Sequence, residues 1–96
     1  MLHSTVPPDF DGDCSKGMGF LNSCQIYTCL CPKEFDDEQT KILWEMSYMK
    51  YGHAQRWTAQ IFHWEQLPEN SGYPRFPDWD DFHAEFCKEF TPAHAN

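Results

Sequence analysis

Aromatic residues at helical spacing near the end of the chain constrain the fold more than any other feature. Trp79, Phe82, Phe86 and Phe90 stand at i, i+3, i+7 and i+11. This spacing places all four on one face of a helix, whereas a strand would alternate them. The residues between them are mostly charged, as expected for the solvated side of an amphipathic helix, and Asp78 is placed to cap the first turn. Such an aromatic face requires other helices to cover it.

Three further helices are predicted upstream. The first runs from about residue 13 to residue 31, with Asp13 as its cap and Pro32 as its stop. The second begins at a capping box formed by Asp36 and Gln39 and ends near residue 50 or 51. The third follows Gly52 and ends near residue 67, before an exposed loop over residues 68 to 77. The predicted fold class is all-α, a compact bundle of about four to five helices.

The chain divides into three parts on this reading. Residues 1–12 contain a Pro-Pro pair and no helical period, which predicts an extended N-terminal arm anchored by Phe10. Residues 13–92 form the helical domain, and residues 93–96 form a short tail. A chain of 96 residues is expected to make one small domain.

The second predicted helix carries apolar residues on two sides. One stripe is expected to face the core and the other to stand nearly opposite, because each set repeats at helical spacing. A helix that is apolar on both sides is either central in a bundle or available to an outside partner. The two stripes are Ile42, Leu43, Met46 and Met49, and Trp44, Tyr48 and Tyr51.

Charge and hydropathy exclude several classes of partner. The formal net charge is −8, with 15 acidic against 7 basic residues. Direct binding to nucleic acid is therefore not expected, because Lys and Arg must neutralise the phosphates. No apolar run reaches the roughly 20 residues that a membrane-spanning helix requires, and the N-terminus lacks the layout of a signal peptide. The expectation is a cytoplasmic protein without a membrane partner.

Neither a metal site, a cofactor nor an active site is predicted. The five cysteines are an odd number and are expected to remain reduced. None of them has the spacing of a zinc site, and buried small side chains are the expected role. No nucleophile elbow or phosphate-binding glycine loop occurs. We expect His53, His63 and His83 to be solvated or at the edge of the core, so the chain is predicted not to be an enzyme.

Several landmarks, taken in chain order, match a known family. They are Phe10-x-Gly12 before the first helix, Phe20-Leu21 within it, Lys41-Ile42 in the second helix, Gly52-x-Ala54-x-x-Trp57 at the start of the third, and the final aromatic stripe. In these residues the chain resembles the N-terminal lobe of the capsid region of Gag from gypsy-type long-terminal-repeat retrotransposons. The resemblance covers about residues 9 to 92 and implies the fold of retroviral capsid N-terminal domains.

These landmark residues also have structural roles that need no ligand. Gly52 permits a close turn that a Cβ would crowd, and Ala54 lets the third helix approach its neighbour. Gly12 ends the arm in an Asp-Gly turn. Trp57 and the final aromatic stripe are expected to fill the core, because helical aromatic stripes are ordinarily packing surfaces.

The resemblance implies a structural function without chemistry. Gag capsid lobes associate through helix surfaces into particles that enclose the element's RNA, so the implied partners are other Gag copies in a weak homo-oligomer. Trp44, Tyr48 and Tyr51 are the candidate outward residues. Burial of this stripe against the arm or the first helix is the alternative. The C-terminal lobe that usually supplies dimer contacts in the family is not present in this sequence, and neither is the zinc knuckle or a basic tail. RNA binding in the family belongs mainly to that missing part.

A second function is compatible with the same resemblance. Some Gag-derived cellular proteins hold short linear peptides in a groove beside the N-terminal arm. Phe10, Tyr27, Trp44 and Tyr48 are the candidates to line such a groove here. The chain would then be an adaptor and not an assembly unit.

Overall fold

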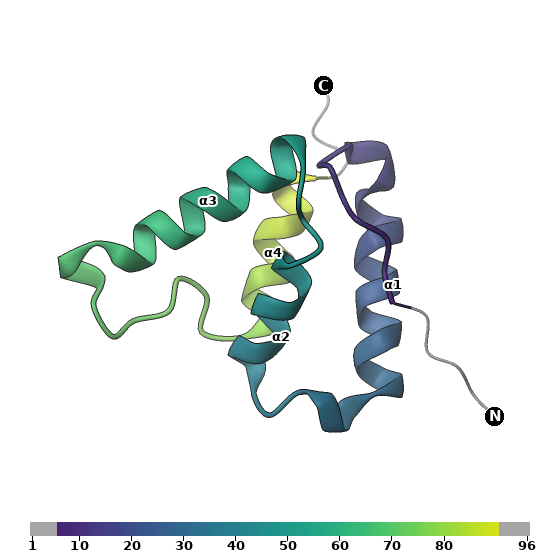
Figure 1. Ribbon diagram of the computed structural model, residues 1–96, viewed down its shortest axis with the longest axis horizontal. Coiled ribbons are helices and arrows are strands. Elements are labelled where there is room, and N and C mark those ends of the chain that lie inside the picture. Colours follow the sequence, from purple (N-terminus) through teal and green to yellow (C-terminus); the bar gives the residue numbers. More distant parts are fainter. Residues whose placement is uncertain (1–5, 91–96) are drawn as a thin grey trace.

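Residues 6–90 fold into four α-helices and three short 3-10 turns (Figure 1). The computed structural model describes residues 6–90, and no β-strand occurs among them. The helices are α1 (Gly17–Leu30), α2 (Glu38–Met46), α3 (Gly52–Gln66) and α4 (Trp79–Glu89). The turns are Cys14–Lys16, Pro32–Glu34 and Pro68–Asn70. The all-α prediction is confirmed. The first five residues of the predicted arm and the predicted tail 93–96 lie outside the described residues.

The aromatic face of α4 forms the centre of the core. Phe82, Phe86 and Phe90 are fully buried, and α4 contacts both α1 and α2. The ring centre of Trp57 lies 5.4 Å from that of Phe82. The predicted cap is confirmed, since Asp78 Oδ1 accepts a hydrogen bond of 2.8 Å from the amide of Asp81. The helix with the clearest sequence pattern is therefore the one that contributes the central side chains of the core.

The first helix begins through a 3-10 turn. Asp13 caps that turn by accepting hydrogen bonds from the amide and hydroxyl of Ser15, at 2.9 and 2.8 Å. The α-helix proper then starts at Gly17, three residues after the turn begins. Its buried face consists of Gly17, Phe20, Leu21, Cys24 and Thr28.

The predicted capping box of the second helix is wrong. Asp37, and not Asp36, is the cap, and its Oδ1 accepts from the amide of Thr40 at 2.8 Å. The Gln39 side chain does not return to the backbone of its own helix. Its amide instead donates to the carbonyl of Phe76 at 2.6 Å. Gln39 therefore ties the start of α2 to the loop before α4.

The second helix is also shorter than predicted. It ends at Met46, and the chain from Ser47 to Tyr51 runs in turns and extended backbone. The i, i+4, i+7 stripe of Trp44, Tyr48 and Tyr51 is therefore not a helix face. The other stripe is wrong at Leu43, which is 54% exposed, while Ile42, Met46 and Met49 are buried as expected.

The arm packs where the third helix begins. The amide of Phe10 donates to the carbonyl of Tyr48 at 2.7 Å, and the amide of Ala54 donates to the carbonyl of Asp11 at 3.3 Å. Gly12 has a φ of +96° and Gly52 a φ of +57°. A Cβ at Gly12 would lie 2.6 Å from the Ala54 nitrogen, and one at Gly52 would lie 2.7 Å from the Asp11 oxygen. Both glycines are therefore required by backbone conformation and by close approach.

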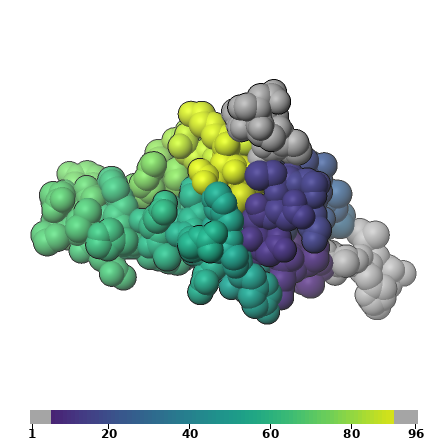
Figure 2. All heavy atoms as spheres, turned by 90° about the horizontal axis from the view of Figure 1, so that it is seen from above, coloured from purple at the N-terminus to yellow at the C-terminus, as the bar shows by residue number. Residues whose placement is uncertain are grey.

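The third helix leaves the rest of the bundle along its length (Figure 1). Its buried residues, Ala54, Thr58 and Ile61, all belong to its first ten positions. Seen from above, the end of α3 and the loop after it project to one side (Figure 2). Residues 67–78 then return to α4, with one 3-10 turn in what the sequence predicted as an exposed loop.

Candidate functional site

A buried polar network joins α2 to α4. Glu45 is completely buried, and its Oε1 accepts a hydrogen bond of 3.0 Å from the indole nitrogen of Trp79. Nε2 of His83 lies 2.8 Å from the same oxygen. The Oε2 atom has no hydrogen-bond partner among the described residues. The expectation that His83 is solvated or at the core edge is wrong, because its side chain is enclosed with this carboxylate.

Burial changes the acidity of two groups in this region. Desolvation raises the pKa of Glu45, while the hydrogen bond and charge of His83 and the hydrogen bond from Trp79 act in the opposite direction. Desolvation also raises the pKa of the Cys24 thiol, and the charge of Glu45 adds to that effect. Cys24 therefore stays protonated, as a small buried side chain and not as a nucleophile.

Three of the residues predicted to line a peptide groove form one cluster of rings. Tyr27 stacks on Trp44 at 5.0 Å, and Trp44 meets Tyr48 edge to face at 5.5 Å. Phe35, which the sequence did not single out as a site residue, packs against Trp44 at 5.2 Å. The Tyr27 hydroxyl donates to Glu34 at 2.9 Å, which together with desolvation raises the pKa of Tyr27 to about 12. These rings therefore pack against one another in a single cluster.

The two remaining candidates lie elsewhere. Phe10 is in the core and stacks on Phe20 at 4.8 Å. Tyr51 is 58% exposed and has no ring contact among the described residues. A hollow of about 480 Å³ does lie beside the arm, between Phe10 and the first half of α1. Its lining residues are Pro8, Asp9, Phe10, Ser15, Lys16, Gly19, Phe20 and Ser23.

The outward side of α1 is an exposed surface without charge. Of the four helices described between residues 6 and 90, α1 is the only one that contains no Asp, Glu, Lys or Arg. Ile26 is 60% exposed, and Met18 and Leu30 are exposed beside it. The surface, called here the outer face of α1, consists of Met18, Gly19, Asn22, Gln25, Ile26, Cys29 and Leu30. Sequence reasoning missed it, although the missing charge between residues 17 and 30 was a usable signal.

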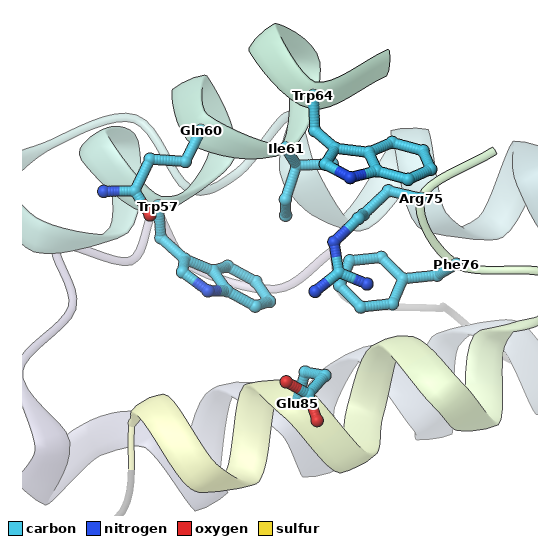
Figure 3. A pocket seen from close by; sticks show the side chains of 7 residues that line it. All are labelled: Trp57, Gln60, Ile61, Trp64, Arg75, Phe76 and Glu85. Atoms are coloured by element: carbon cyan, nitrogen blue, oxygen red, sulfur yellow. The ribbon is translucent and has the colours of Figure 1, made fainter. Parts of the chain in front are cut away.

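A pocket between α3 and α4 was also missed (Figure 3). It has a volume of about 230 Å³ and combines aromatic rings with polar side chains. Trp57 and Trp64 extend from α3, Glu85 comes from α4, and Arg75 from the intervening loop. We call it the Arg75 pocket, lined by Trp57, Gln60, Ile61, Trp64, Arg75, Phe76 and Glu85. Arg75 stands in a loop without periodicity, so no pattern pointed to it.

Across residues 6–90 no group of three or more His, Cys, Asp or Glu side chains is placed to hold a metal ion. Over the same residues no helix has the length and apolar character needed to cross a membrane. Comparisons with protein-family models, curated proteins and solved structures found no match to this chain.

Proposed function

We propose that this chain is a non-enzymatic structural domain of the Gag capsid type that associates weakly with copies of itself through the outer face of α1. The observation that carries the proposal is the exposed and uncharged surface on a chain with a net charge of −8. Like charges oppose the approach of two copies over most of their surface. The outer face of α1 allows contact without apposing those charges, and burying Ile26 and its neighbours there favours association.

The arrangement of this face suits a symmetric pair. When two copies of α1 lie antiparallel about a twofold axis near residue 24, residue i of one copy faces residue 48 − i of the other, since both helices have the same rise per residue. Met18 of one copy then lies level with Leu30 of the other copy, and Asn22 lies level with Ile26 of the other copy. Gly19 meets Cys29 of the other copy, and its missing side chain allows close approach. All of these residues are exposed in the single chain.

The alternative surface inferred from the sequence is less suited to association. Trp44 and Tyr48 are half-buried within the ring cluster and pack against the core. Tyr51 is the exposed member of that set, and one exposed ring makes a small contact. We therefore place the contact on α1 and not on Trp44, Tyr48 and Tyr51.

Sedimentation velocity across a wide range of protein concentration tests the proposal. The weight-average mass should rise with concentration, and more steeply at high salt, which screens the repulsion between acidic copies. Ile26→Glu should abolish the rise. Leu43→Glu places the same charge on an exposed leucine of α2 and should leave it unchanged. A constant monomer mass at millimolar concentration and high salt, or equal effects of the two variants, would refute the proposal.

The hollow beside the arm supports a second candidate function, an adaptor that binds extended peptides. Its volume of about 480 Å³ and the presence of Phe10 in its wall fit a short apolar segment lying along α1. Amide spectra recorded with a panel of extended aromatic peptides would test it. Shifts confined to the hollow and removed by Ser23→Trp, which fills it, would support binding. An unchanged spectrum across the panel would exclude it.

A further inference from the structure

The Arg75 guanidinium lies over two aromatic rings. Its guanidinium carbon lies 4.6 Å from the ring centre of Phe76 and 5.8 Å from that of Trp64. Its backbone amide donates to the carboxylate of Glu65 at 2.9 Å. Figure 3 shows the guanidinium between the two rings and directed into the pocket. Stacking engages the faces of a guanidinium and leaves its N–H groups at the edge for a planar acceptor.

The side chains of the pocket that can donate hydrogen bonds have no hydrogen-bond acceptor within residues 6–90. No hydrogen bond or ion pair joins the Arg75 guanidinium to a described residue, and the Gln60 amide and the indole nitrogens of Trp57 and Trp64 likewise make none. Glu85 is the one carboxylate in the lining, and its Oε2 is paired with Lys88 at 3.0 Å. The pocket therefore offers more free donors than acceptors, which favours a ligand that accepts hydrogen bonds.

The remaining walls are apolar. Ile61 and Phe76 are buried beneath the pocket, and the Trp57 ring lies 6.2 Å from that of Phe76. The pocket volume of about 230 Å³ exceeds that of several water molecules, each of about 30 Å³ in the liquid. It therefore has room for one apolar side chain beside a polar group. Rings and aliphatic groups around a few polar atoms are the usual composition of a small-ligand site.

We propose that the Arg75 pocket binds a carboxylate that is attached to an apolar group, as at the C-terminal residue of a peptide ending in Phe or Leu. The carboxylate would take two parallel hydrogen bonds from Arg75, and the apolar side chain would lie against Trp57, Ile61 and Phe76. A carboxylate fits better than a phosphate, because Glu85 and the net charge of −8 oppose a doubly charged ligand. This site lies on α3, α4 and their loop, apart from the outer face of α1, so it goes beyond the proposed self-association.

A matched pair of ligands tests the proposal on the unaltered protein. The indole N–H signals of Trp57 and Trp64 would be followed by NMR during titration with N-acetyl-phenylalanine and with its amide, which lacks the carboxylate. The acid should shift both signals and bind at least about 10-fold more tightly than the amide, since a hydrogen bond to a charged group is worth about 1.5 to 3 kcal/mol. Equal affinity of acid and amide, or no shift at millimolar ligand, would overturn the proposal.

Substitutions then test whether Arg75 is the residue that binds the carboxylate of the ligand. Arg75→Gln should weaken binding of the acid about 10-fold or more and leave binding of the amide unchanged. Arg56→Gln removes the same charge from α3 outside the pocket and should have no effect. Undiminished binding by Arg75→Gln would overturn the assignment. If the variant fails to fold, the ligand pair still decides the question.

Titration with a short peptide ending in Phe distinguishes peptide chain ends from small apolar acids as the ligand. Tighter binding of the peptide than of N-acetyl-phenylalanine would assign the pocket to peptide chain ends. Equal binding would assign it to small apolar acids. Sedimentation behaviour is independent of this titration, so failure of one proposal does not imply failure of the other.

Discussion

The carboxylate of Glu45 in α2 lies 2.8 Å from the imidazole of His83 in α4, and both side chains are shielded from solvent. This pair is a polar connection between α2 and α4 inside a core that is mostly apolar. Because the carboxylate is buried, removing His83 would leave the Trp79 indole as its remaining hydrogen-bond donor among the described residues. The burial of the Glu45 carboxylate also makes the stability of the domain depend on pH.

Glu45→Gln should become progressively more stabilising as pH rises. Desolvation raises the folded-state pKa of Glu45 above its unfolded value. Its contribution to stability is therefore fully present below the unfolded carboxyl pKa of about 4.3 and is lost as pH rises toward the folded value. Glutamine keeps the shape and does not titrate.

The free energy of unfolding of both proteins, measured with urea from about pH 4 to about pH 7, checks this expectation. The difference, variant minus unaltered protein, should increase across that range. Glu69→Gln removes the same charge from an exposed turn and should give a flat difference. A difference for Glu45→Gln that falls as pH rises would show that the carboxylate is stabilised as an anion.

Phe82→Ala should lower the free energy of unfolding by about 3 to 5 kcal/mol, because the ring is fully buried and its removal leaves a cavity. Phe62→Ala makes the same chemical change on α3, where the ring is 39% exposed. That variant should change stability by less than about 1 kcal/mol. Urea unfolding monitored by circular dichroism measures both. Similar losses at the two positions would contradict the placement of the core.

Gly17→Ala should destabilise the domain by about 1 to 3 kcal/mol, since a Cβ there would overlap the carbonyl oxygen of Phe90 and force α1 away from the end of α4. Gly19→Ala is the control on the same helix, because nothing lies within 4 Å of its Cβ position. It should stabilise the helix by roughly 0.5 to 1 kcal/mol. Thermal unfolding of dilute protein compares the two, and a stabilising Gly17→Ala would exclude this close approach.

Gly19→Cys should form an intermolecular disulfide with the native Cys29 of a second copy if two α1 helices pair as proposed. Within one helix the two positions are about 15 Å apart, so they cannot bond to each other. Mild oxidation followed by electrophoresis without reductant should show a dimer. Adding Cys29→Ser should remove that dimer, and its persistence would point to another pairing of copies.

Features encoded locally were the ones that sequence reasoning predicted. The α4 helix has its cap at Asp78 and its aromatic period within twelve consecutive residues. The tight approach at Gly52 followed in part from the residue type, because glycine lacks a Cβ and adopts a positive φ without steric cost. These elements needed no knowledge of distant contacts.

The errors arose where a tertiary contact decided between local alternatives. Asp36 and Asp37 are both able to cap a helix, and Phe35 packs into the rings of Tyr27 and Trp44 just before them. Helical spacing continued past Met46, yet the carbonyl of Tyr48 bonds to the arm at Phe10. Periodicity shows which face of a helix is apolar. It does not show which backbone groups form hydrogen bonds with distant parts of the chain.

Because α3 projects from the bundle, its last turn is expected to be less stable than its first half. Its first half is fixed by Ala54, Thr58 and Ile61, whereas residues 62–66 contribute no buried side chain. Backbone hydrogen bonds in that last turn can open without disturbing the aromatic centre. Amide protons near Trp64 should therefore exchange with deuterium well before those of α4, and a ligand in the Arg75 pocket would slow that exchange.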